Sequence, residues 1–182
     1  MITIVACGIL ADEIKGVIQN LTISPPIIIM PPALCLHPER LKKELKKVLE
    51  KIENSKIVVY GKCFPGIDDV CSQYAAHRIA GETCAEIVAG EQVYQLLKEE
   101  PGTYFLLPTF CEQFEELTKE LDMEKTKGIL FKNYNRCIFL DTGKNGNTCK
   151  KIAEQLGLSY HREVVGVSVL EKRLKNLLNT II

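Results

Sequence analysis

Ile2-Thr3-Ile4-Val5-Ala6-Cys7-Gly8 opens the chain with a short apolar run that ends in a cysteine and a glycine. A run of this kind is typical of a strand that is buried on both faces of a parallel sheet. A similar ending recurs in Val58-Val59-Tyr60-Gly61-Lys62-Cys63 and in Ala80-Gly81-Glu82-Thr83-Cys84. Because the ends of parallel strands meet at one edge of a sheet, these three cysteines are predicted to converge there.

Strand-like and helix-like stretches alternate along the sequence. The predicted strands are Ile2 to Cys7, Ile27 to Met30, Lys56 to Tyr60, Thr103 to Leu107, Arg136 to Leu140 and Ser159 to Val165. The predicted helices are Ala11 to Asn20, one opened by Pro38, Ile67 to His77, one begun by Thr83, Glu91 to Glu100, Phe110 to Leu121, Cys149 to Leu156 and Val169 to Leu178. Repeated β-α-β units predict the α/β class, with a single doubly wound, mostly parallel sheet and helices on both of its faces.

Composition places the chain among globular proteins. With 182 residues, 46% of them hydrophobic, it is long enough to bury a core as one domain over residues 1–182. The 23 basic and 23 acidic residues balance, and we therefore expect neither a nucleic acid nor a membrane surface as a partner. The start lacks a secretion signal, and prolines interrupt the longest apolar stretch, Ile23 to Leu36. These features predict a cytoplasmic protein.

Eight cysteines in a cytoplasmic chain indicate thiols or metal ligands rather than disulfides, because that compartment is reducing. The sequence contains no Cys-x-x-Cys pair, which excludes a local zinc ribbon. Cys7, Cys63 and Cys84 are instead predicted to form a metal site assembled by folding, with one coordination position open. Zinc and a [4Fe-4S] cluster both fit three thiolates. The competing interpretation is that these cysteines pack in the core, as free cysteines often do.

Other residues could complete this site. Cys71 and Cys35 are the reserve ligands, and His37 follows the second predicted strand on a loop that could face the same edge. Packing and helix capping are the competing roles for His37.

The turns themselves supply further candidates. Tyr60 and Gly61 lie at the predicted pocket rim and Gly8 at the corresponding turn, while Glu82 is a candidate carboxylate at the start of a helix. Glutamate is also common in a first helical turn for stability alone. Cys84 lies at the same helix start, where the helix dipole is expected to lower the pKa of its thiol.

Several motifs together carry a family resemblance. They are Ala6-Cys7-Gly8-Ile9-Leu10, Leu36-His37-Pro38-Glu39-Arg40-Leu41, Tyr60-Gly61-Lys62-Cys63, Cys84-Ala85-Glu86-Ile87-Val88-Ala89-Gly90-Glu91, Glu100-Pro101-Gly102-Thr103-Tyr104-Phe105-Leu106 and Phe131-Lys132-Asn133-Tyr134. With these motifs, nearly the whole chain resembles domain-of-unknown-function family 1638, which is found widely in methanogens and other anaerobes. Members are often associated with corrinoid and one-carbon methyl metabolism. The resemblance implies that setting and assigns no catalytic residue.

Three functions remain open from the sequence. The first is an enzyme whose cysteine-held metal or cluster acts on a small-molecule substrate in methyl metabolism. The second is a non-catalytic metal or cluster carrier, or an accessory protein to a methyltransferase partner. The third is an α/β scaffold with inert core cysteines. An acid–base residue beside a buried site favours the enzyme, and an exposed site favours the carrier.

Overall fold

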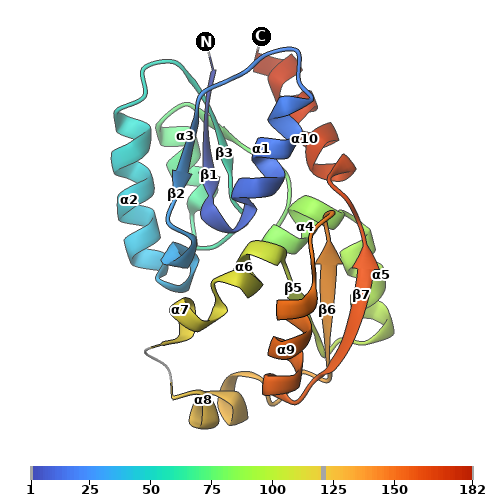
Figure 1. The fold of residues 1–182 in the computed structure, drawn as a ribbon. Helices are drawn as coiled ribbons and strands as arrows, with labels where there is room; N and C mark the ends of the chain where they lie inside the picture. Colours follow the sequence, from blue (N-terminus) through green and yellow to red (C-terminus); the bar gives the residue numbers. More distant parts are fainter. Residues whose placement is uncertain (1, 120–121, 182) are drawn as a thin grey trace. The chain divides into compact units, whose positions relative to one another are not determined.

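The computed structural model describes residues 2–119 and 122–181, and Figure 1 shows its helices and strands. These residues form two compact units. Unit 1 comprises residues 1–88 and 167–182, and unit 2 comprises residues 89–166. Each unit contains its own parallel sheet. Among the helices described, none combines the length and apolar character that crossing a membrane requires.

The sheet of unit 1 has four parallel strands in the order β2-β1-β3-β4. Their bounds are β1 Ile2–Cys7, β2 Ile27–Met30, β3 Ser55–Val59 and β4 Ala76–Arg78. Every residue of β1 is buried, as the unbroken apolar run predicts for a strand with a neighbour on each side. Within the sheet, Ala6 is paired with Ile29 on β2 and with Val59 on β3.

Helices cover both faces of this sheet. Their bounds are α1 Ala11–Gln19, α2 Pro38–Glu50, α3 Ile67–Gln73 and α10 Ser168–Ile181. In Figure 1, α1 and α10 lie on one side of the strands and α2 and α3 on the other. The chain therefore leaves β1 toward one side and β3 toward the opposite side. The carboxyl ends of β1 and β3 flank a topological switch point, where open α/β sheets usually bind their ligands.

Three short segments follow the strand ends of unit 1. The 3-10 turns η1 and η2 span Gly8–Leu10 and Pro32–Leu36, after β1 and β2 respectively. The helix α4, Cys84–Ala89, follows β4. These segments bring candidate site residues to the switch point.

Unit 2 has three parallel strands in the order β5-β6-β7. The strands are β5 Thr103–Leu106, β6 Arg136–Asp141 and β7 Ser159–Val164. The helices are α5 Gln92–Glu99, α6 Pro108–Glu112, α7 Phe114–Thr118, α8 Met123–Leu130 and α9 Asn147–Leu156. Side chains from β6, α6 and α9, among them Phe139 and Ile152, form its buried core.

A disulfide joins Cys111 of α6 to Cys149 of α9 inside that core, with their Cα atoms 5.2 Å apart. The expectation of thiols or metal ligands rather than disulfides is therefore wrong for this pair. The two helices pack against the same sheet and bring the sulfur atoms together, although 38 residues separate them in the sequence. The other six cysteines are free.

The α/β class and the parallel strands are confirmed, but the prediction of one sheet is corrected to two. The first sheet ends at β4, which pairs with β3 and is followed by the helices α4 and α5 before β5 begins. The next strand, β5, pairs with β6 and starts a second sheet. A single domain over residues 1–182 stays a prediction.

Two predicted helices have different bounds. The helix predicted from Ile67 ends at Gln73, because Ala75 has a φ of 50° and the chain turns there into β4. The helix predicted from Phe110 is interrupted at Gln113, between α6 and α7. Its predicted end at Leu121 lies outside the described residues.

A candidate thiol site at the sheet switch point

Three free thiols come together at the switch point of unit 1. Cys7 is the last residue of β1, Cys63 lies in the loop after β3, and Cys84 is the first residue of α4. The thiol of Cys84 makes side-chain hydrogen-bond contacts with the thiols of both Cys7 and Cys63. The sequence pattern of strand-end cysteines thus places three thiols in one cluster, which we call the thiol trio.

The thiol trio shares its protons unevenly. Hydrogen bonds with Cys63 and Cys7, together with burial, raise the pKa of Cys84 well above its ordinary value. The same contacts lower the pKa of Cys7 and of Cys63, in each case against the effect of burial. Cys84 therefore holds its proton most tightly and shares it with two neighbours that ionise more readily. The expectation that the helix dipole lowers the pKa of Cys84 is wrong, because two adjacent thiols outweigh a six-residue helix.

Two glycines allow the turns to pack closely around these thiols. A Cβ atom on Gly8 would lie 2.6 Å from the carbonyl oxygen of Met30. A Cβ atom on Gly61 would lie 2.7 Å from the carbonyl oxygen of Glu82. Both distances are shorter than a side chain tolerates, so glycine is required for the backbone approach. Gly61 thereby brings the loop that carries Cys63 against the segment that precedes Cys84.

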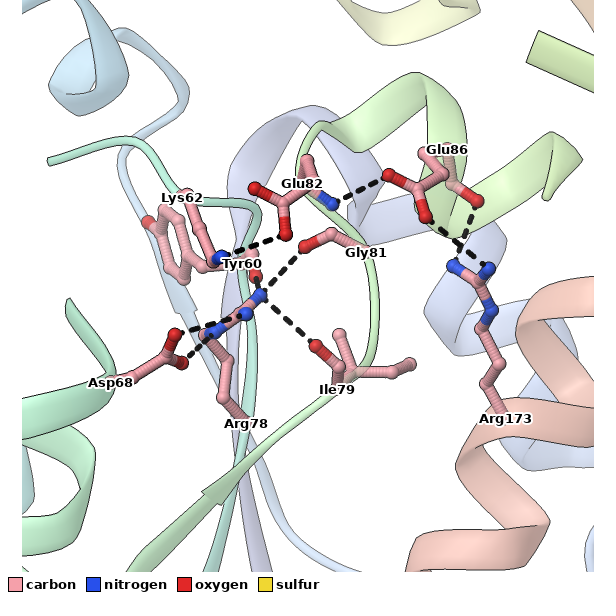
Figure 2. Close-up of polar contacts among 9 residues, drawn as sticks. All are labelled: Tyr60, Lys62, Asp68, Arg78, Ile79, Gly81, Glu82, Glu86 and Arg173. Atoms are coloured by element: carbon pink, nitrogen blue, oxygen red, sulfur yellow. Dashed lines mark hydrogen bonds and ion pairs between the residues drawn. The ribbon is translucent and has the colours of Figure 1, made fainter. Parts of the chain in front are cut away.

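A largely buried arginine ties the ends of β3 and β4 together, as Figure 2 shows. Arg78, whose side chain is 10% exposed, donates through Nη1 to the carbonyl oxygens of Tyr60, Ile79 and Gly81, at 3.0, 3.1 and 2.7 Å. Its Nε pairs with the carboxylate of Asp68. The guanidinium also contributes, after the Cys84 hydrogen bond, to lowering the pKa of Cys63. Arg78 thus supplies both geometry and positive charge.

The start of α4 is fixed by a set of polar contacts, of which those that Glu86 makes with Glu82 and with Arg173 appear in Figure 2. Thr83 Oγ1 accepts a hydrogen bond from the backbone N–H of Glu86 at 3.1 Å, which confirms Thr83 as the N-cap. The Glu86 carboxylate accepts from the N–H of Glu82 at 2.7 Å. Arg173 of α10 donates to the carbonyl oxygens of Glu86 and Ala80, at 2.8 and 2.7 Å. These bonds hold the first residue of the helix, Cys84, in place.

Tyr60 is fully buried beside the thiol trio. Its hydroxyl contacts the Cys7 thiol, but no group among the described residues forms a hydrogen bond of good geometry with it. Burial, followed by the nearby thiols of Cys7, Cys63 and Cys35, raises the pKa of Tyr60 far above its ordinary value. Tyr60 was predicted at the rim of a pocket, and the structure places it inside the protein.

The two reserve cysteines differ in position. Cys35 of η2 is electrostatically coupled to Cys7 and Cys63, and burial together with these neighbours raises its pKa to about 12. Its Sγ donates to the carbonyl oxygen of Pro32 at 3.4 Å. Cys71 of α3 has Arg78 and Asp68 as its charged neighbours, and burial raises its pKa to about 11. The structure therefore brings Cys35 to the thiol trio, whereas the contacts of Cys71 lie with the Asp68–Arg78 pair.

His37 and Glu82 differ from the buried thiols in their exposure. The side chain of His37 is exposed between η2 and α2. The carboxylate of Glu82 is 54% exposed and pairs with Lys62 at 2.8 Å. An exposed pair of this kind contributes little to stability.

A surface pocket of about 450 Å³ adjoins the site. It is formed by residues 62–69, the loop that follows β3 together with the start of α3, and Cys63 is one of its lining residues. Cys63 is partly exposed, whereas Cys7 is fully buried. Cys63 therefore connects the buried thiols with the surface.

Sequence reasoning missed the arginines of the site, Arg78 and Arg173. One available signal was the placement of Arg78 between Ala76 and Ile79, in a short stretch that otherwise suits a strand. A charge in such a stretch requires partners. The sequence around Arg173 contains no signal of its role, because its partners lie 87 and 93 residues away in the sequence.

The donor set of the thiol trio suits a soft metal ion. Among the described residues, no three His, Cys, Asp or Glu side chains are already arranged to hold a metal ion. The thiols are in hydrogen-bonded contact, and a bound ion would replace the proton that Cys84 shares.

Comparisons with known proteins give one match. Searches of the curated proteins and of the solved structures found no match. The family model described as a protein of unknown function, DUF1638, matches residues 29–174. This match includes Cys63, Cys84 and Arg78, while Cys7 precedes it. Because the match covers most of the 182 residues, the chain belongs to the DUF1638 family.

Proposed function

We propose that Cys7, Cys63 and Cys84 bind a metal ion or an iron–sulfur cluster, which the protein uses in the cytoplasmic one-carbon methyl metabolism of an anaerobe. The observation that carries the proposal is the contact of the Cys84 thiol with both other thiols. They come from three separate strand ends, so the contact is made by the fold rather than by a local motif. The methyl-metabolism setting rests on the family resemblance alone.

The chemistry of the thiol trio favours a single soft ion over a cubane. Three thiolates that bind one Zn²⁺ at about 2.3 Å lie next to one another. The cysteines of a cubane bind different irons and are correspondingly farther apart. Cys84 contacts both partners, which matches the closer arrangement. A bound Zn²⁺ would supply Lewis acidity, while the three cysteines hold it and leave one position open.

Burial favours an enzyme acting on a small molecule over a carrier. A carrier must pass its metal to a partner protein, which requires exposed ligands. Cys63 and Cys84 are partly exposed, but Cys7 and Tyr60 are both 0% exposed, so the ligand set is not open to a partner protein as a whole. The hydroxyl of Tyr60 also supplies a hydrogen-bond donor beside the thiols, which can orient a small molecule there. The metal or cluster carrier stays the alternative.

The test is metal content. We expect full-length protein purified without oxygen to contain about one metal ion or one cluster per chain, measured by elemental analysis. Its ultraviolet–visible spectrum distinguishes zinc, which is colourless, from an iron–sulfur cluster, which absorbs visible light.

We expect Cys84→Ser to lose this metal while the fold persists, because a serine hydroxyl stays protonated near neutral pH and is a poor ligand for a soft metal. Cys71→Ala is the matched control, since it removes a thiol whose described contacts lie outside the thiol trio. Circular dichroism checks both folds. Full metal content in Cys84→Ser would refute the proposal. An equal loss of metal in Cys71→Ala would show that metal binding does not depend specifically on the thiol trio, and it would refute the proposal as well.

A further inference from the structure

The hydroxyl of Tyr60 is the one feature of the site that the thiol trio leaves unexplained. The residue is 0% exposed, and the described residues provide no hydrogen-bond partner of good geometry for its oxygen. Native proteins rarely leave a buried hydroxyl unsatisfied, and they supply a partner from the protein, from ordered water or from a ligand. The side chain therefore indicates a group that binds next to it.

The surroundings of this hydroxyl show what is missing. The thiols of Cys7, Cys63 and Cys35 are its electrostatic neighbours. Cys35 directs its own S–H to the carbonyl oxygen of Pro32. The proton of Cys84 is shared with Cys7 and Cys63. Three thiols therefore lie near the hydroxyl, and none of the described residues accepts its O–H in good geometry.

We infer that a small ligand with a lone pair on oxygen or sulfur, either water or an alkyl thiol, binds between the Tyr60 hydroxyl and the thiol trio. Its donor atom occupies the position that the three cysteines leave open on the metal. The same atom accepts a hydrogen bond from Tyr60. The inference rests on the proposed function, since it uses the metal as the second anchor of the ligand.

Tyr60 also suits this role by position. It directly follows β3, and its carbonyl oxygen is held by Arg78 at 3.0 Å. The backbone is thus anchored on one side, while the ring reaches the thiols. A donor on a rigid strand end is more accurately placed than one on a mobile loop. Cys35, in a 3-10 turn between prolines, is the competing candidate for the open position.

The experiment uses the full chain loaded with Co²⁺, whose visible absorption reports the ligands and their geometry. The proteins compared are the wild type, Tyr60→Phe and Tyr74→Phe. The spectrum of each is recorded first without thiol and then during a titration with ethanethiol. We expect Co²⁺ to bind all three proteins equally. We expect Tyr60→Phe to bind ethanethiol at least about tenfold more weakly than the wild type does, because the variant lacks one hydrogen bond to a charged acceptor. Tyr74→Phe, a tyrosine of the same unit in the turn after α3, should match the wild type.

A response to ethanethiol identifies a thiol as an accepted ligand. If the spectrum keeps an oxygen ligand at all thiol concentrations, loss of the bands of that oxygen ligand in Tyr60→Phe alone identifies bound water and equally supports the inference. A shift confined to the cobalt–thiolate bands would report only the contact of Tyr60 with Cys7 and would count against it.

Three outcomes would overturn it. Identical spectra and thiol affinities in Tyr60→Phe and the wild type would show that the hydroxyl contacts no ligand at the open position of the metal. A thiol response that appears only in Cys35→Ser would show that Cys35 fills the open position. Absence of cobalt–thiolate absorption in the wild type would refute the metal site itself, and this result is distinct from the first two because no cobalt is bound.

Discussion

Gly61 has no side chain, and this lets the loop that carries Cys63 pack against the backbone of Glu82 and Thr83. We expect Gly61→Ala to destabilise the protein by about 1–3 kcal/mol, because the new Cβ atom would overlap the backbone of Glu82 and Thr83. Gly16→Ala is the control, since a Cβ atom there meets nothing within 4 Å. It lies in α1 and should stabilise the helix by up to about 1 kcal/mol. Urea unfolding measures both, and equal effects would contradict the close packing at Gly61.

Arg78 combines three backbone contacts with a charge near the thiol trio. In metal-free protein we expect Arg78→Met to raise the pKa of Cys63, because the positive charge that favours its thiolate is removed. Alkylation of Cys63 by iodoacetamide should then be severalfold slower at pH 7, and its rate should rise at higher pH than in the wild type. Arg78→Lys, which keeps the charge, should change the profile less.

Peptide mass spectrometry identifies the alkylated cysteine in this experiment. A Met variant with the wild-type pH profile would show that Arg78 acts only through its hydrogen bonds. Arg78 also marks the limit of prediction at the residue scale. Cys7, Cys63 and Cys84 could be picked out because a strand end is visible in the sequence. The partners of Arg78 are carbonyl oxygens, and no sequence pattern records where a carbonyl oxygen lies.

At the scale of the element, α6 and α9 show why the cysteine pairing was missed. The sequence predicts both helices, but it predicts thiols or metal ligands rather than disulfides for the cysteines. Pairing depends on which helices share a sheet face and on their rotation about their own axes. In unit 2, both crossovers lie over β6, which fixes Cys111 and Cys149 at 5.2 Å between Cα atoms.

We expect this disulfide to stabilise unit 2. Closing a loop of 38 residues contributes about 4 kcal/mol in the chain-entropy model. Dithiothreitol, or the double variant Cys111→Ala with Cys149→Ala, should therefore increase hydrogen exchange of the β6 amides. Cys137→Ala, a free cysteine in the same core, is the control for the loss of a buried sulfur. Peptide mapping without reductant should find the linked pair, and two unlinked peptides would contradict it.

The short strand β4 illustrates a second limit of local patterns. Its three residues come directly after Ala75, which has a positive φ, a backbone conformation that residues other than glycine rarely adopt. The spacing of apolar residues predicts a helix that extends to His77, but in the structure the helix ends at Gln73 and His77 lies in β4. Pairing with β3 through Ile57 and Val58 stabilises the strand, and this pairing is a tertiary effect.

At the scale of the molecule, alternation of strands and helices was enough to predict the α/β class and the parallel direction of the strands. The number of sheets was not predictable in the same way. A β-α-β pattern looks the same whether the next strand extends the old sheet or begins a new one. Here the change occurs between β4 and β5, which two helices separate, yet three helices separate β5 from β6 and these strands are paired, so the number of helices does not mark the change. The convergence of the strand-end thiols survived this error because all three lie in unit 1.

The return of α10 to unit 1 has a consequence for the order in which the protein is made. This helix packs beside α1, yet it is synthesised only after all of unit 2. At about 5–20 residues per second, the ribosome needs on the order of 5–20 s after Val88 to deliver it. During that time α10 does not cover the apolar face of α1, whereas all three cysteines of the thiol trio have already been synthesised. The nascent chain can therefore gather its thiols before the unit that houses them is closed.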